Sequence, residues 1–258
     1  MYNILYLGNS LHVVNQLQFI RNINIVAVVF ESGKENENQL RSISSTIKTI
    51  PAKNKREIED VIMQYCDTVD FAVMYDFGII LSEQAVSRIP IFNYHPGALK
   101  TNRGSSPINW SILLNEKETT MSLYRVSAEI DLGELVSEHP CRIYDHDVPD
   151  SLRARIEGEI PSMMLELVKC FEKKAYKGTV SNGIYRKRLN ETDYTILETD
   201  SEEMIKAKIR SQYSYRGAVI YSNCKKIYVQ TYDQYLKIKQ NELRCSKENG
   251  LSDENLLL

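Results

Sequence analysis

The chain has 258 residues, of which 43% are hydrophobic and 26% charged, a composition typical of a folded globular protein. Its 32 basic and 34 acidic residues give a net charge of −2, which argues against a nucleic-acid-binding surface, because such surfaces carry a basic excess. Five cysteines are scattered without C-x-x-C spacing, no apolar run reaches the ~18–20 residues that cross a bilayer, and the N-terminus lacks a signal-peptide pattern. We therefore predict a cytoplasmic protein with reduced thiols, no metal site and no membrane segment.

The first hundred residues alternate short apolar runs with helical periodicity. Strands are predicted at residues 4–7, 25–30, 71–74 and 91–94, and helices at 11–20 and 57–65. This alternation predicts βα units and an α/β fold with a mostly parallel sheet covered on both faces. In such sheets, ligands bind beyond the carboxyl ends of the strands.

Further elements follow. A short helix is predicted at residues 107–114, strands at 119–126 and 134–142, one long helix at 149–171, and a hairpin from 218–221 with 226–230. We predict a main domain at residues 1–182, a small α+β appendage with a helix and a hairpin at 183–240, and a polar tail at 241–258. Residues 237–258 are expected to be frayed or disordered apart from their apolar end.

The segment from Asn93 to Pro107 carries the most informative chemical pattern. Asn93 and His95 stand two residues apart at the end of an apolar strand, so their side chains project from the same face. Pro96 favours an extended backbone at His95. Asp131 adds a carboxylate in a loop between two later strands.

An amide, an imidazole and a carboxylate together suit acyl transfer. Asn93 can donate to a developing oxyanion, His95 can stabilise that charge or pass a proton to the leaving nitrogen, and Asp131 can favour the protonated imidazole. No serine or cysteine nucleophile accompanies them, so the incoming amine is expected to attack the acyl carbon directly. Taken singly, each residue also has a structural interpretation, as a turn former for Asn93 and Asp131 and as a hydrogen-bonded structural residue for His95.

Together these segments resemble the folate-dependent formyltransferase family, whose pattern runs Asn-x-His-Pro-Ser-Leu-Leu-Pro, Arg-Gly-x-x-Pro, Thr-Gly-x-Thr-x-His and Asp-Thr-Gly-x-Ile. The matching residues, with the spacing intact, are Asn93, His95, Pro96, Leu99, Arg103, Gly104, Pro107, Thr119, Asp131 and Gly133. The resemblance covers about residues 1–180 and implies a Rossmann-like catalytic domain. One departure is Tyr124, which stands in place of the second histidine; we expect it not to touch Asn93, His95 or Asp131.

The resemblance also implies a folate cosubstrate, N10-formyltetrahydrofolate. The family loop that holds the pterin ring through backbone groups is matched by Phe77, Gly78, Ile79, Ile80 and Leu81, and the loop carrying Glu129 and Ile130 is expected to flank the folate. Residues 213–229 resemble the segment that follows the catalytic domain in sugar-nucleotide formyltransferases. His139 and His146 are interpreted as surface residues.

We expect the acceptor to be the amino group of a dTDP- or UDP-linked amino sugar, such as dTDP-4-amino-4,6-dideoxyglucose, used for bacterial surface polysaccharide (O-antigen). Candidates for binding its diphosphate are Ser10, His12, Lys100 and Arg103. The tyrosine-rich C-terminal region is expected to stack on the base or to form a homodimer. The alternatives are a methionyl-tRNA formyltransferase, a formyltetrahydrofolate hydrolase and a non-catalytic nucleotide-binding module.

Overall fold

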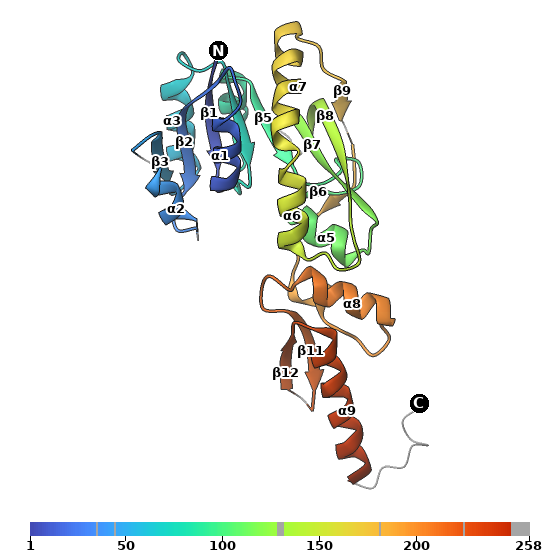
Figure 1. Ribbon diagram of the computed structural model, residues 1–258. Coiled ribbons are helices and arrows are strands. Elements are labelled where there is room, and N and C mark those ends of the chain that lie inside the picture. Colours follow the sequence, from blue (N-terminus) through green and yellow to red (C-terminus); the bar gives the residue numbers. More distant parts are fainter. Residues whose placement is uncertain (35, 44, 128–131, 181, 224, 249–258) are drawn as a thin grey trace. The chain divides into compact units, whose positions relative to one another are not determined.

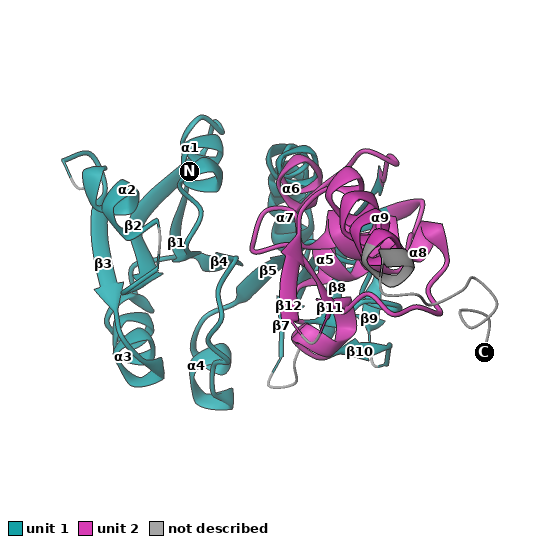
Figure 2. Cartoon of the chain, turned by 90° about the horizontal axis from the view of Figure 1, so that it is seen from below, with its two compact units in different colours: residues 1–104, 119–141, 154–186 teal, residues 105–118, 142–153, 187–258 magenta. Residues whose placement is uncertain are grey.

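The computed structural model describes residues 1–34, 36–43, 45–127, 132–180, 182–223 and 225–248. The chain folds into two compact units, which Figure 2 colours separately. Unit 1 comprises residues 1–104, 119–141 and 154–186, and unit 2 comprises residues 105–118, 142–153 and 187–258. The predicted boundaries at residues 182 and 240 concern domains rather than these units and stay predictions.

Unit 1 is built on an eight-stranded sheet (Figure 1). In sheet order the strands are β3 (Lys48–Ala52), β2 (Ile23–Glu31), β1 (Tyr2–Gly8), β4 (Phe71–Tyr75), β5 (Ile91–His95), β7 (Glu118–Val126), β8 (Gly133–Arg142) and β9 (Gly178–Val180). The strands from β3 to β5 pair in parallel, and β5 then pairs antiparallel with β7. The prediction of a mostly parallel sheet is confirmed.

Helices cover both faces of this sheet. They are α1 (Leu11–Gln18), α2 (Glu37–Ser42), α3 (Lys55–Tyr65), α4 (Glu83–Arg88), the part of α6 (Pro149–Glu157) from residue 154 on, and α7 (Ile160–Lys173). One face packs against α3 and α4 through residues such as Leu7 and Ile62, and Phe171 of α7 contacts Phe71 and Phe92 on the other face. A short strand pair, β6 (Arg103–Gly104) with β10 (Tyr185–Arg186), completes unit 1.

The prediction of one helix over residues 149–171 is wrong, because α6 ends at Glu157 and α7 begins at Ile160. At the break, the amides of Gly158 and Glu159 bond to carbonyls three residues earlier, both at 3.2 Å. Glycine is a poor helix former, and Pro161 in the first turn of α7 supplies no amide hydrogen. The apolar periodicity continues across this point although the hydrogen-bonded helix does not.

Unit 2 packs helices against a two-stranded hairpin. Its elements are α5 (Pro107–Leu113), the 3₁₀ helix η1 (Glu191–Tyr194), α8 (Glu202–Ser211), β11 (Ala218–Ser222), β12 (Lys225–Val229) and α9 (Tyr232–Glu248). The hairpin is confirmed, with Ile220 paired to Ile227 in an antiparallel ladder. A small core including Ile205, Ile209 and Val229 joins α8 to the hairpin.

Residues 237–248 are helical, so the prediction of disorder for this part of the tail is wrong. Tyr232, Tyr235 and Ile238 recur every three residues and pack against the hairpin core, which anchors α9. Most of the remaining positions are polar, and this polar composition hid the helical spacing. Residues 249–258 of the predicted polar tail lie outside the described residues.

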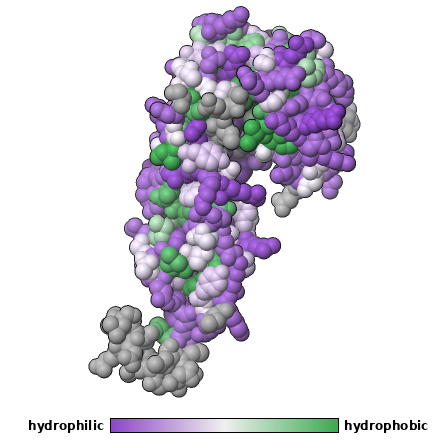
Figure 3. Space-filling model, turned by 180° about the vertical axis from the view of Figure 1, so that it is seen from behind, coloured by the Kyte–Doolittle hydropathy of each residue, from purple (hydrophilic) through white to green (hydrophobic). Residues whose placement is uncertain are grey.

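The surface is mainly polar. Figure 3 shows hydrophilic residues over most of one face, with hydrophobic residues in small separate patches. Within the described part of the chain, no helix has the length and apolar character needed to cross a bilayer.

His139 on β8 differs from its predicted surface location, because its side chain is only 21% exposed. Its Nδ1 lies 2.8 Å from a carboxylate oxygen of Glu159, and its Nε2 lies 3.1 Å from one of Glu166. The ring therefore links β8 to the start of α7. His146 is exposed, as predicted.

Candidate active site

Asn93 and His95 occupy the carboxyl end of β5. Alternation along the strand puts both side chains on one face of the sheet, with Asn93 partly buried and His95 only 5% exposed. The register with β7 sets Asn93 opposite Tyr124 and His95 opposite Ser122. Both side chains thus lie at the strand end where sheets of this topology bind ligands.

The imidazole of His95 is held by the backbone that follows it. Its Nε2 lies 2.8 Å from the carbonyl oxygen of Asn102. The chain curls back to this point because the Asn102 amide donates to the carbonyl of Ala98, also at 2.8 Å. A carbonyl oxygen can only accept, so Nε2 carries the hydrogen and Nδ1 is the acceptor nitrogen of the neutral ring.

Tyr124 contacts the predicted catalytic group, so the expectation that it stands apart is wrong. The Asn93 Nδ2 donates a hydrogen bond of 2.9 Å to the Tyr124 hydroxyl. The contact follows from the register, because residues directly opposite on neighbouring strands share a face. Tyr124 is 2% exposed, so this hydrogen bond lies in the interior of unit 1.

Asp131, Glu129 and Ile130 lie outside the described residues. The roles predicted for them, a carboxylate beside His95 and two contacts to folate, stay predictions. The described residues nearest to them in sequence are Ser127 and Leu132, and the Ser127 hydroxyl donates to the Leu132 carbonyl at 2.9 Å. This bond draws together the two ends of the segment that carries Asp131.

The loop predicted to hold a pterin ring follows β4. Phe77 and Ile79 pack against the core and Leu81 is buried, whereas Ile80 is 56% exposed. Within the described residues, the backbone groups of Phe77, Ile79 and Ile80 make no hydrogen bond. Backbone groups without a protein partner are available to a bound ring, so the loop fits a ligand of this kind. Contact with folate itself stays a prediction.

Glu31, which sequence reasoning missed, ties this loop to two other strand ends. Its Oε1 accepts hydrogen bonds from the Gly78 amide at 2.8 Å and from Asn9 Nδ2 at 2.9 Å. Asn9 Nδ2 also donates to the Asp76 carbonyl at 2.7 Å. One carboxylate and one amide therefore join the ends of β1, β2 and β4. The available signal was an acidic residue directly after the apolar run 25–30.

The four residues predicted to bind a diphosphate lie on two segments at the same edge of the sheet. Ser10 lies in the turn after β1, where its hydroxyl caps α1, and His12 is an exposed residue in the first turn of α1. Lys100 and Arg103 follow β5; Lys100 is exposed, and Arg103 donates to a backbone carbonyl at 3.2 Å. Because β4 separates β1 from β5, the two strands lie roughly 10 Å apart. Diphosphate binding by these residues stays a prediction.

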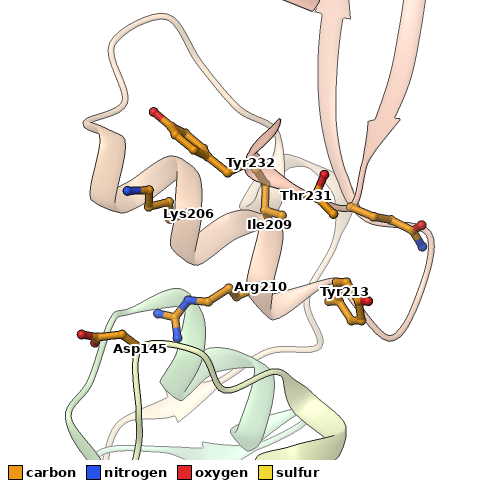
Figure 4. Close-up of a pocket in the computed structure, with 8 residues that line it drawn as sticks. Asp145, Lys206, Ile209, Arg210, Tyr213, Thr231 and Tyr232 are labelled. Atoms are coloured by element: carbon orange, nitrogen blue, oxygen red, sulfur yellow. The ribbon is translucent and has the colours of Figure 1, made fainter. Parts of the chain in front are cut away.

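Unit 2 contains a pocket of about 250 Å³, shown in Figure 4. Its lining combines phenol rings, cations and hydrogen-bonding groups: Asp145, Lys206, Ile209, Arg210, Tyr213, Gln230, Thr231 and Tyr232. The guanidinium of Arg210 donates to the carbonyls of Tyr144 and Asp147, at 3.2 and 3.3 Å, so part of its hydrogen-bonding capacity is already used. Lys206 Nζ lies 4.8 Å from the centre of the Tyr232 ring.

The sequence of this chain is similar to those of known formyltransferases. The sequence pattern of the formyl transferase family matches residues 11–168, more than half of the chain. A methionyl-tRNA formyltransferase from Pseudothermotoga lettingae is 24% identical over 223 residues, which cover 83% of this chain and 74% of that protein.

Two solved structures share the fold. A 4-N formyltransferase from Francisella tularensis superposes with a TM-score of 0.73 at 12% identity, covering 89% of this chain and 97% of that one. WlaRD, a sugar 3N-formyl transferase crystallised in the presence of dTDP and 5-N-formyl-THF, superposes with a TM-score of 0.65 at 21% identity, covering 88% and 84%. The resemblance predicted from Asn93, His95 and their spacing is thereby confirmed: the chain belongs to the formyl transferase family and is an enzyme that transfers a formyl group.

Proposed function

We propose that the protein transfers a formyl group from N10-formyltetrahydrofolate to the amino group of a nucleotide-linked amino sugar. The observation that carries the proposal is the extent of the fold match with WlaRD, a sugar 3N-formyl transferase, 84% of whose chain is covered. That match takes in 88% of the present chain, more than unit 1 alone provides. The sugar acceptor is therefore favoured by both units and not by the catalytic unit alone.

The loop after β4 is the part of the chain that suits a folate. N10-formyltetrahydrofolate supplies the formyl carbon as an electrophile. Phe77 and Ile79 provide apolar contact from their packed positions, and the backbone groups of residues 77–80 supply donors and acceptors for a pterin ring. Glu31 holds the Gly78 amide, so this hydrogen is used within the protein and the neighbouring amides are those left for the ring.

Asn93 and His95 act on the reacting atoms in this proposal. The Asn93 carboxamide has two Nδ2 hydrogens, of which Tyr124 receives one, and the second stabilises negative charge on the formyl oxygen. The His95 ring stays bonded through Nε2 to the Asn102 carbonyl, and its imidazole takes up the proton that the amine loses and delivers a proton to the leaving nitrogen. Asp131 is proposed to favour the protonated ring.

The diphosphate of the nucleotide needs cationic or hydrogen-bonding partners. Lys100 and His12 are exposed cationic or hydrogen-bonding groups at the strand ends and are our first candidates for the diphosphate, with Ser10 and Arg103 beside them. We propose that the reaction takes place in the cytoplasm, because the described cysteines are free thiols. We also propose that the protein forms a homodimer through its C-terminal region.

An acceptor panel tests the proposal. The values of kcat/KM are compared for dTDP- and UDP-linked 3-amino and 4-amino sugars, for their hydroxyl counterparts, and for initiator methionyl-tRNA. We expect at least one amino sugar to be formylated and no hydroxyl counterpart to react, because only a neutral amine can attack. Efficient formylation of methionyl-tRNA with no turnover of any amino sugar would replace this function with that of the Pseudothermotoga lettingae relative.

A further inference from the structure

The pair formed by Asn93 and Tyr124 has a consequence for catalysis. The two residues lie directly opposite one another on β5 and β7, and the Asn93 Nδ2 donates to the Tyr124 hydroxyl at 2.9 Å. Tyr124 is 2% exposed, so water does not readily replace the phenol as partner. The contact is set by strand register and shielded from water, and in it the Asn93 Nδ2 is held against the Tyr124 hydroxyl.

Orientation matters because a carboxamide has two chemically different ends. Rotation by 180° about its last side-chain bond exchanges the nitrogen, which donates, with the oxygen, which only accepts. An oxygen facing the reaction would repel the developing oxyanion instead of stabilising it. A water molecule could accept from Nδ2 in many positions, whereas the buried Tyr124 hydroxyl accepts from it at one fixed position.

We propose that Tyr124 is a positioning residue for formyl transfer: its hydroxyl accepts one Nδ2 hydrogen of Asn93 and thereby keeps the second Nδ2 hydrogen available to the formyl oxygen. The inference rests on the catalytic role that the proposed function gives to Asn93. It does not depend on which amine is the acceptor. Tyr124 itself touches neither substrate nor reacting atoms in this account.

The tyrosine at position 124 also affects how the hydrogen bond to Asn93 depends on pH. The formyltransferase pattern that this chain resembles has a histidine where Tyr124 stands. A phenol, with an ordinary pKa of about 10, keeps its accepting oxygen across the physiological range, whereas an imidazole, with an ordinary pKa of about 6.5, loses its acceptor when protonated.

Three variants test the inference by steady-state kinetics. Tyr124→Phe keeps the ring and removes the acceptor, and we expect kcat to fall about tenfold with both KM values unchanged. Tyr124→His should restore kcat above about pH 8 and lose it again below about pH 6 relative to wild type. The matched control is Tyr94→Phe, which removes a buried hydroxyl from the neighbouring residue of β5, on the opposite face of the strand, and should leave kcat unchanged.

A double-mutant cycle separates this inference from the proposed function. In an Asn93→Ala background, Tyr124→Phe should have no further effect, because the group it positions is gone. Full activity of Asn93→Ala would remove the catalytic role of Asn93, and with it the basis of the inference. A damaging Asn93→Ala combined with a harmless Tyr124→Phe would overturn the positioning role alone.

A measurement without substrate completes the test. In ¹⁵N-edited NMR spectra of the folate-free protein, the two Nδ2 protons of Asn93 should be further apart in chemical shift in wild type than in Tyr124→Phe, because only one of them is bonded to the phenol. Thermal unfolding of each variant checks that the fold persists. Identical Asn93 side-chain signals in folded wild type and folded Tyr124→Phe would contradict the inference.

Discussion

Asn93 and His95 lie on a strand paired on both sides, whereas the predicted folate loop leaves β4 with several backbone groups unpaired. His95 is 5% exposed and bonded to a backbone carbonyl; Ile80 in the loop is 56% exposed. The first region has little freedom to move, and the second has accessible donors and acceptors. The difference indicates that the predicted catalytic residues lie where the backbone is rigid. The predicted folate-binding groups lie where backbone donors and acceptors are accessible.

The largest effect is expected at His95. His95→Ala should lower kcat by ~10²–10⁴ while leaving the affinity for the nucleotide sugar nearly unchanged, since the imidazole acts on the transition state. The matched control is His139→Ala, which removes a partly buried histidine on β8 and should retain kcat within about twofold. Retention of more than about a tenth of wild-type kcat by His95→Ala would rule out its assigned role.

A somewhat smaller effect is expected at Asn93. Asn93→Ala removes the proposed oxyanion donor, and kcat should fall by ~10²–10³ at unchanged donor affinity. Asn24→Ala is the control, because Asn24 is exposed on β2 and its side-chain amide donates to the Asn3 side chain. Equal turnover by the two variants would place Asn93 among the structural residues.

Loss of support for the loop after β4 is expected to change the Kd for folate rather than kcat. Glu31→Ala removes the acceptor of the Gly78 amide and one of the two acceptors of Asn9 Nδ2, so the loop is held less firmly to β2, and the Kd for folate should rise about tenfold by calorimetry. At saturating donor, kcat should stay within about twofold of wild type. Glu37→Ala, which removes a carboxylate that accepts the Gly33 amide, is the control. A large loss of kcat at unchanged Kd would erase the distinction between the two regions.

The smallest effect is expected outside both regions, at His139. Burial lowers the pKa of His139, but the hydrogen bonds to Glu159 and Glu166 outweigh it, so the folded-state pKa lies above the usual 6.5. Stabilisation by a raised pKa is fully present below about pH 6.5 and is lost as pH rises through the folded-state value. His139→Gln should therefore lower Tm by roughly 2–4 °C at acidic pH and by less at alkaline pH. A Tm difference that grows with pH would contradict this interaction.

Local spacing accounts for the parts of the fold that sequence reasoning predicted. The two-residue spacing of Asn93 and His95 and the hairpin of residues 218–229 depend only on neighbours along the chain, and the structure has both. The long helix at residues 149–171 failed because apolar periodicity continues through Gly158 while the hydrogen-bonded turns do not. The helix at residues 237–248 was missed because polar composition outweighed the spacing of its few anchoring residues.

Contacts between residues far apart along the chain could not be predicted from the sequence alone. The bond from Asn93 to Tyr124 spans 31 residues, and the bond from Gly78 to Glu31 spans 47. A single sequence indicates which face a strand residue occupies but not which residue of the next strand lies opposite, since that depends on register. The site could therefore be predicted as a set of strand-end residues, while the groups that orient them could not.

The central claim is that the formyl group passes to an amine and not to water. A single-turnover experiment tests it most directly, with N10-formyltetrahydrofolate carrying ¹³C in the formyl group, dTDP-4-amino-4,6-dideoxyglucose as acceptor, and ¹³C NMR of the quenched mixture. The account predicts the label in a formamide on the sugar, formate at the level of an enzyme-free blank, and no labelled product with the hydroxyl counterpart. Labelled formate as the main product in the presence of amino-sugar acceptors would contradict it and identify a hydrolase.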